Sequence, residues 1–199
     1  GEFVAPLTNK ELYSADEGSH WVAINPTAGT GILGHAAPTT FDEAKPYLLV
    51  YNGGSNRIYP QSLLLVDSAV SVGGTRMQFN FSLDTGNRLS SGGTTLTKSN
   101  VNMDIGTASS ATITAGAVVG TAVTANRRLL GNYVIRGANI DVVWDHYEFI
   151  FGAPGGSSGG ALTPTTVAQH FTRYMPPVVI GPGQSFAMVQ WAASQSTGP

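Results

Sequence analysis

The feature that most constrains the fold of this chain is an alternation of apolar and polar residues with a period of two. In residues 77–83, Met77, Phe79, Phe81 and Leu83 are apolar, and the residues between them are polar. Because successive side chains of a β-strand point to opposite faces, this pattern predicts a strand with one buried face. Other segments are rich in the β-branched and aromatic residues that favour strands. These segments are residues 21–24, 47–51, 58–66, 111–123, 129–136, 140–151, 177–180 and 185–193.

Clusters of glycine, asparagine, aspartate and serine separate the predicted strands. Residues 52–55, 84–87 and 155–160 are examples, and such residues supply the positive φ angles and side-chain turns that end strands. Asn52-Gly53 and the tripeptide 84–86 are the best candidates for hairpins. The sequence has no convincing apolar stripe at helical spacing; residues 42–45 and 165–173 are the candidates for isolated helical turns.

Many short strands with little helix predict an all-β fold, either a jelly-roll-like β-sandwich or a barrel, with extended terminal arms. We expect residues 1–15 to be an N-terminal arm and residues 16–199 to form a single β domain. Within it, residues 99–124 have almost only small side chains, which predicts a closely packed strand pair or an excursion, with a low-complexity loop as the alternative. Residues 152–165 are rich in glycine, serine and proline and predict a loop.

The chain has few charged residues, which indicates that part of its surface contacts other proteins. Charged residues make up 11% of the sequence, against about 25% in an average soluble protein. Protein interfaces are depleted in Lys, Glu and Asp, whereas a solvated monomer is normally covered with charged side chains. We therefore expect an oligomer whose exterior is partly buried by neighbouring subunits. A monomer with a neutral Thr/Ser/Asn surface is the alternative.

Composition also argues against several classes of function. The chain has no cysteine, so disulfides and every thiolate chemistry are excluded. The net charge is −2 and the basic residues are scattered, whereas nucleic-acid binding needs clustered Lys and Arg. The sequence has no run of about 18 apolar residues, so we expect no membrane-spanning helix.

Residues 156–160 form the one segment with a catalytic pattern. It is similar to the Gly-x-Ser-Gly-Gly loop of chymotrypsin-like serine proteases, and this resemblance implies that Ser158 would be the nucleophile. However, Ser157 stands where those proteases have an aspartate, and neither His20 nor His35 lies in the small-residue motif around their general base. A plain Gly/Ser loop produces the same run of residues. We predict that the protein is not an enzyme, with a serine hydrolase as the less favoured alternative.

The densest group of titratable residues lies at residues 141–148. On a strand, His146 and Glu148 would share one face and could together ligate a metal ion. A zinc site would need two more ligands from the other three histidines, and no spacing predicts them. A salt-bridged or hydrogen-bonded pair on an exposed face explains the two residues equally well. We expect no metal and no cofactor.

Two further functions use residue types that almost any β domain contains. Asp141 and Asp145 are candidates for a glycoside-hydrolase carboxylate pair, although nothing distinguishes them from turn and strand-end residues. Four aromatic residues are candidates for a sugar-binding platform: Tyr13, Trp21, Tyr133 and Tyr147. Core packing is the more frequent use of such residues. A tail adhesin or a carbohydrate-binding β module is therefore the alternative function.

The segment 175–196 resembles the closing region of virion structural proteins of tailed bacteriophages. In it, Pro176-Pro177 leads into an apolar stretch, residues 182–185 have the order Pro-Gly-x-Ser, and an aliphatic stretch ends in Trp191. In that family, a proline-led strand, a Pro-Gly-x-Ser turn and an aliphatic strand ending in Trp close a jelly-roll-like domain. The resemblance is specific in this segment only.

This resemblance implies a capsid decoration or cement protein that stabilises a phage head. Its partners would be the major capsid protein and copies of itself, in a homotrimer on the capsid surface of a virion assembled in the host cytoplasm. It would contact neither nucleic acid nor a membrane directly. The candidate interface residues lie in the N-terminal arm and the last predicted strand: Phe3, Val4, Leu7, Phe186, Met188, Gln190 and Trp191.

Overall fold

The computed structural model describes residues 14–35, 40–68, 74–106, 108–140, 144–152 and 170–191. Over these ranges the chain is nearly all β, and its only helical turn is at residues 14–16. Phe3, Val4 and Leu7 lie outside the described residues, as does most of the predicted N-terminal arm.

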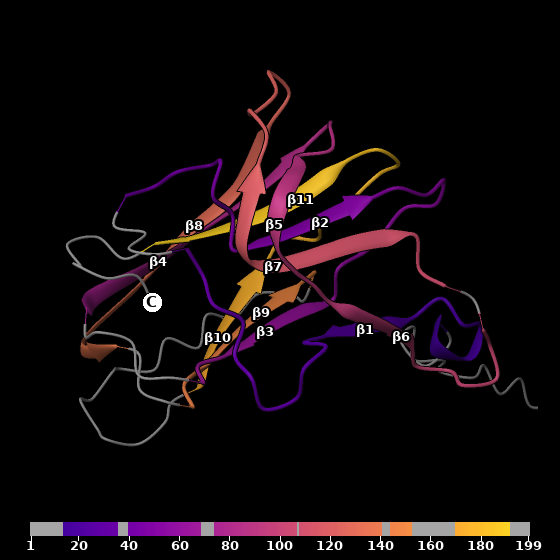
Figure 1. Ribbon diagram of the computed structural model, residues 1–199, viewed down its shortest axis with the longest axis horizontal. Helices are drawn as coiled ribbons and strands as arrows, with labels where there is room; N and C mark the ends of the chain where they lie inside the picture. The colour runs from indigo at the N-terminus through magenta and orange to yellow at the C-terminus, as the bar shows by residue number, and fades with distance from the viewer. Residues whose placement is uncertain are drawn as a thin grey trace, which may run out of the picture.

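The strands are distributed along the whole of the described chain (Figure 1). In chain order they are β1 (Trp21–Ile24), β2 (Leu48–Asn52), β3 (Ser62–Val66), β4 (Gly74–Asp84), β5 (Leu89–Thr95), β6 (Thr97–Asn100), β7 (Ala111–Gly120), β8 (Arg128–Ile140), β9 (His146–Phe151), β10 (His170–Met175) and β11 (Ser185–Trp191).

Two sheets form the body of the molecule. The larger has the strand order β5-β7-β2-β11-β4-β8, and the smaller has the order β10-β9-β3. All neighbouring strands are antiparallel except β9 and β10, which are parallel. From β2 through β3 to β4, and again from β8 through β9 and β10 to β11, the chain crosses from the large sheet to the small one and back. The predicted all-β sandwich is confirmed.

The core lies between the inner faces of the two sheets, where aromatic rings from β4 and β9 contact one another. The ring centroids of Phe81 and Phe149 are 4.7 Å apart, and those of Phe79 and Phe149 are 5.2 Å apart. Phe79 and Phe81 are fully buried, and Phe149 is 1% exposed. The alternation predicted for residues 77–83 therefore places its apolar side chains in the core, which is what the period of two requires.

The last strand is central to the large sheet and is not a surface for partners. β11 pairs with β2 on one side and with β4 on the other. Phe186 is 2% exposed, Met188 is fully buried and Trp191 is 8% exposed. The prediction that these three residues form an interface is therefore wrong, because their side chains pack within this chain. Gln190 is half-buried, and its amide contacts the sulfur of Met77 at 3.4 Å.

The short link between β4 and β5 indicates that the large sheet is curled, because this link is not extended: the Gly86 amide donates to Asp84 Oδ1 at 3.3 Å. β4 and β5 stand four places apart in the strand order, which is about 19 Å in a flat sheet. Only residues 85–88 join them, and the five Cα–Cα steps from Asp84 to Leu89 reach about 18 Å at most. β7 contains Gly116 at φ 96°. Before this residue the strand pairs with β2 on one side and β5 on the other, and from residue 118 onward it pairs with β5 alone.

Several local predictions differ from the structure. Neither Asn52-Gly53 nor the tripeptide 84–86 forms a hairpin, because β3 lies in the other sheet from β2 and β4 does not pair with β5. Residues 177–180 make only the isolated bridge Ile58–Ile180. The second predicted helical turn is wrong where it is described, because residues 170–173 belong to β10, where pairing with β9 overrides local preference.

Candidate interaction surface

The outer face of the three-stranded sheet points away from the large sheet. Strand alternation and pairing register define which side chains it carries. We call these nine residues the outer face: Ser62, Leu64, Val66, His146, Glu148, Ile150, His170, Thr172 and Tyr174. The residues between them point inward, as the stacking of Tyr147 on Phe171 shows, with centroids 5.3 Å apart and planes 9° apart.

The outer face mixes exposed apolar side chains with mostly neutral polar ones and is nearly uncharged. Leu64 is 55% exposed, Val66 42% and Tyr174 36%. Of the nine residues only Glu148 carries a full charge when the histidines are neutral. A solvated sheet face normally alternates polar residues outward, so this face has the composition of an interface core, from which charge is depleted.

Two histidines and one carboxylate lie together on the outer face. His146 and His170 are paired in the parallel register of β9 and β10, with ring centroids 5.6 Å apart. His170 Nε2 lies 3.1 Å from Glu148 Oε2, and the Thr172 hydroxyl donates to the same oxygen at 3.3 Å. The strand pairing thus holds the Glu148 carboxylate against two groups of the neighbouring strand.

A strained aromatic residue adjoins the outer face. Trp144, two residues before His146, has φ 77° and is 61% exposed. Its amide donates to the carbonyl of Asp67 at 2.8 Å, and the Asp67 amide donates to the carbonyl of Asp145 at 2.9 Å. These bonds hold a conformation that side-chain-bearing residues rarely adopt, and strain of this kind concentrates at functional sites.

The two-stranded sheet of β1 and β6 extends away from the body (Figure 1). Val22 and Ile24 are 46% and 55% exposed on one of its faces. Lys98 anchors it by donating to the carbonyls of Ser109 and Ala111. Within the described residues both outer edges of this ribbon lack a strand partner, and such edges can pair with another chain.

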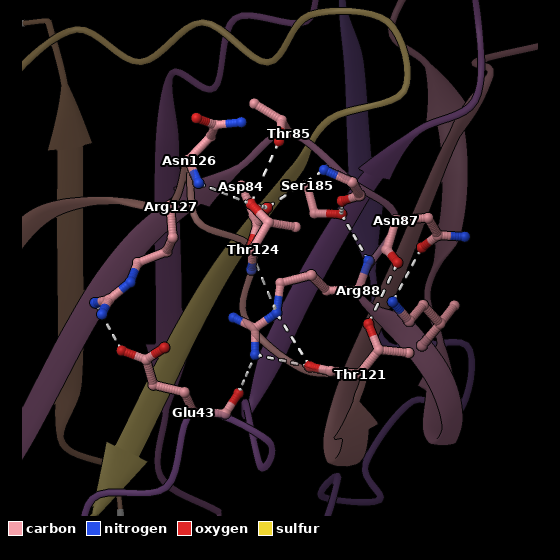
Figure 2. A network of polar contacts seen from close by, with 12 residues as sticks. Glu43, Asp84, Thr85, Asn87, Arg88, Thr121, Thr124, Asn126, Arg127 and Ser185 are labelled. Atoms are coloured by element: carbon pink, nitrogen blue, oxygen red, sulfur yellow. Dashed lines mark hydrogen bonds and ion pairs between the residues drawn. The ribbon is translucent and has the colours of Figure 1, made fainter.

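A buried polar network joins the loops that the curl of the large sheet brings together (Figure 2). Arg88 lies at its centre and is 1% exposed. Its guanidinium donates to the carbonyls of Glu43 at 2.6 Å and Thr121 at 3.1 Å, and its amide donates to the Ser185 hydroxyl at 3.0 Å. Arg127 Nη1 lies 2.7 Å from Glu43 Oε1. Because these contacts connect segments of the same chain and centre on the buried Arg88, the network is structural.

The Asp84 carboxylate completes this network. Burial raises its pKa, but hydrogen bonds from the Thr124 hydroxyl and amide and from the Gly86 amide lower it, as does the positive charge of Arg88. The net pKa of Asp84 lies below its ordinary value. Asp84 is therefore ionised in the folded protein at neutral pH, as a counter-charge to a buried arginine needs to be.

The residues considered for serine-protease chemistry have other roles or lie outside the described ranges. His35 Nε2 lies 2.6 Å from the carbonyl of Val118, and His20 lies 3.4 Å from the Ser14 hydroxyl. Both contacts hold loops in place. Ser158 and most of the loop 152–165 lie outside the described residues.

The aromatic and carboxylate candidates do not form an open sugar site where they are described. Tyr147 is 3% exposed, and half-buried Tyr133 packs on Phe81 at 5.9 Å, so core packing is their use. Trp21 is half-buried in β1, whereas Tyr13 lies outside the described residues. Asp145 is 2% exposed, and its proposed partner Asp141 is not described.

Some residues of the outer face were missed at the sequence level. Leu64 and Val66 alternate with Leu63 and Leu65, so the apolar run gives no indication of which face is open. The uninterrupted apolar run of residues 63–66 could have indicated them, because it gives β3 apolar side chains on both faces of its sheet. The neighbouring position of His170 could not be found, because it depends on the parallel pairing of β9 and β10.

Among the described residues, no three or more His, Asp or Glu side chains are arranged so that they could hold a metal ion. In the same part of the chain, no helix has the length and apolar character needed to cross a bilayer. No protein-family model, curated protein or solved structure matches the chain.

Proposed function

We propose that this protein is a structural, non-enzymatic β domain that assembles with copies of itself through the outer face of its three-stranded sheet. The observation that carries the proposal is the composition of that face, which exposes Leu64, Val66 and Tyr174 and has Glu148 as its only full charge when the histidines are neutral. A surface with a carboxylate acceptor, imidazole and hydroxyl donors and apolar side chains is able to complement itself across a two-fold axis.

In its finer form, the proposal is that the assembly is a virus shell and that the protein decorates or cements a phage head. Three features support this: the low charge content of the chain, the all-β sandwich of two sheets and the resemblance of residues 175–196. The ribbon of β1 and β6 supplies a second surface, because an exposed strand edge can accept a strand from a neighbour. The homotrimer and the major capsid protein as partner belong to this finer proposal.

The size of the outer face indicates the kind of assembly. Strands about 4.8 Å apart and about five residues long, at about 3.3 Å per residue, give a surface of roughly 15 by 17 Å. A stable protein interface buries about 800 Å² on each partner. One such face therefore makes a weak contact, and strong assembly requires several contacts per subunit.

A second candidate function is glycan binding, and Trp144 is the observation that favours it. An exposed aromatic ring offers an apolar face with a polar edge, and the strained backbone at φ 77° holds it in position. Glycan binding predicts that sugars protect Trp144 fluorescence from quenching, whereas assembly predicts protection that rises with protein concentration.

Sedimentation velocity over a concentration series tests the proposed assembly. Leu64→Glu places a charge on the outer face, and Leu129→Glu is the matched control, because Leu129 in β8 is exposed to a similar extent, 57% against 55%. We expect wild type and Leu129→Glu to self-associate and Leu64→Glu to remain monomeric. Equal association of the two variants, or a wild type that stays monomeric, would contradict assembly through the outer face.

The virion location is tested separately by adding the purified protein to phage heads that lack it. Binding that is lost in Leu64→Glu but kept in Leu129→Glu supports the finer proposal. Failure of all three proteins to bind would contradict it.

A further inference from the structure

Two histidines and a glutamate lie in contact on the outer face. His146 and His170 face each other across β9 and β10, with ring centroids 5.6 Å apart. His170, which is 54% exposed, contacts Glu148, which is 27% exposed. Imidazole is the side chain that ordinarily changes its charge between pH 5 and 8.

We propose that assembly through the outer face is switched by pH: the face associates when the two imidazoles are neutral and is released when both are protonated. This inference rests on the proposed function, since it concerns the regulation of the same surface. The partner is a second copy of this chain.

At neutral pH the outer face is suited to burial. Glu148 is the only ionised side chain on it, and its Oε2 atom lies within hydrogen-bond distance of His170 Nε2 and the Thr172 hydroxyl. A buried carboxylate that accepts hydrogen bonds from neutral groups costs much less than one without partners. The surrounding Leu64 and Tyr174 then bury apolar area when two copies meet.

In acid, the number of ionised groups on each outer face rises from one to three. The Glu148 carboxylate compensates the charge of His170, which it contacts at 3.1 Å. His146 then becomes a second cation beside the first. Each copy would have to bury a net positive charge, and two such faces repel each other.

Within the described part of the chain, no neighbouring carboxylate neutralises the positive charge that the outer face gains in acid. On β3 the register partner of His146 is Val66, and on β10 the position between His170 and Tyr174 is Thr172; neither titrates. The ionisable residues Asp67, Asp145 and Arg173 alternate with the outward-facing positions and belong to the inner side. Among the described residues, Glu148 is thus the one carboxylate on the outer face.

The experiment compares self-association at about pH 7.5 and about pH 5.0 by sedimentation velocity, with circular dichroism to verify folding at both pH values. Three proteins are compared: wild type, the double variant His146→Gln/His170→Gln and the control His20→Gln, which changes a histidine outside the outer face. We expect association of wild type and of the control to weaken about tenfold or more in acid. Association of the double variant should change less than about twofold.

The outcomes separate this inference from the proposed function. Wild type that associates equally at both pH values would overturn the switch and leave the assembly proposal standing. A double variant that dissociates in acid like wild type would also overturn it, because other groups would then be responsible. A wild type that is monomeric at both pH values would overturn the proposed assembly, and the switch with it.

Discussion

The Nε atom of Arg88 lies 3.9 Å from Oδ2 of Asp84, and each of the two side chains is only 2% exposed. Asp84 ends β4 and Arg88 immediately precedes β5, so the pair joins the two ends of the short link that forces the large sheet to curl. The same arginine also donates to carbonyls of two other loops. The buried pair therefore connects the closing loops of the sandwich.

Asp84→Asn should destabilise the fold strongly. The substitution removes the counter-charge of a buried guanidinium, and the loss of one partner of a buried ion pair costs about 3–5 kcal/mol. The control is Asp42→Asn, which changes a surface pair with Lys45 at 3.6 Å and should cost about 0–1 kcal/mol. Urea unfolding measures both; equal effects would show that the buried pair contributes nothing particular.

Acid should destabilise the protein partly through Asp84. The pKa of this carboxyl is lowered in the folded state, below an unfolded value of about 3.9. Its stabilising contribution is therefore present above the unfolded pKa and is lost as the pH falls through the folded pKa. The free energy of unfolding, measured from about pH 6 to about pH 2.5, should fall more steeply for wild type than for Asp84→Asn. Parallel curves would exclude Asp84 as a source of acid sensitivity.

Gly116→Ala should destabilise the bend in β7. Gly116 has φ 96°, and a Cβ atom there would lie 2.6 Å from the Ile32 side chain and 2.7 Å from the Leu33 carbonyl oxygen. The expected cost is more than about 1 kcal/mol. At Gly106 a Cβ atom would meet nothing within 4 Å, so Gly106→Ala should change stability by less than about 0.5 kcal/mol. Thermal and urea unfolding of the two variants would show the difference, and similar values would argue against strain at the bend.

Two substitutions of Trp144 separate backbone strain from the loss of the ring. Both Trp144→Gly and Trp144→Ala remove the same exposed indole, but only glycine adopts φ 77° without a steric cost. We expect Trp144→Gly to be more stable than Trp144→Ala by about 1 kcal/mol in urea unfolding. If alanine is the more stable of the two, the positive φ of Trp144 is not a source of strain.

Much of the fold could be predicted from local patterns. The alternation of Met77, Phe79 and Phe81 with polar residues identified the strand that supplies the core, since a period of two has one structural explanation. The small side chains before Thr124 predicted close packing, and at Gly116 a Cβ atom would lie 2.6 Å from the Ile32 side chain. The alternation and the size of the side chains are properties of neighbouring residues, and so the sequence contains them, whereas the segment that packs against Gly116 comes from residues 32–33.

The candidate site was much less accessible to sequence reasoning. Phe186, Met188 and Trp191 were expected at an interface because an apolar strand face has the same pattern whether its own chain or a partner covers it. In the folded chain Phe186 is 2% exposed, Met188 0% and Trp191 8%, so the chain itself covers these residues. The His146–Glu148 pair was identified, but its position beside His170 depends on the pairing of distant strands.

The sequence alone determined the class of the fold and the low charge of the surface, because composition and alternation act through local backbone geometry and through the number of ionised groups. Only the tertiary structure decided which apolar strand is central, that four residues suffice to join β4 to β5, and which histidines meet on the outer face. The physical reason is that strand order and sheet curvature arise from contacts between residues far apart in the chain, and no local pattern specifies which strands become neighbours.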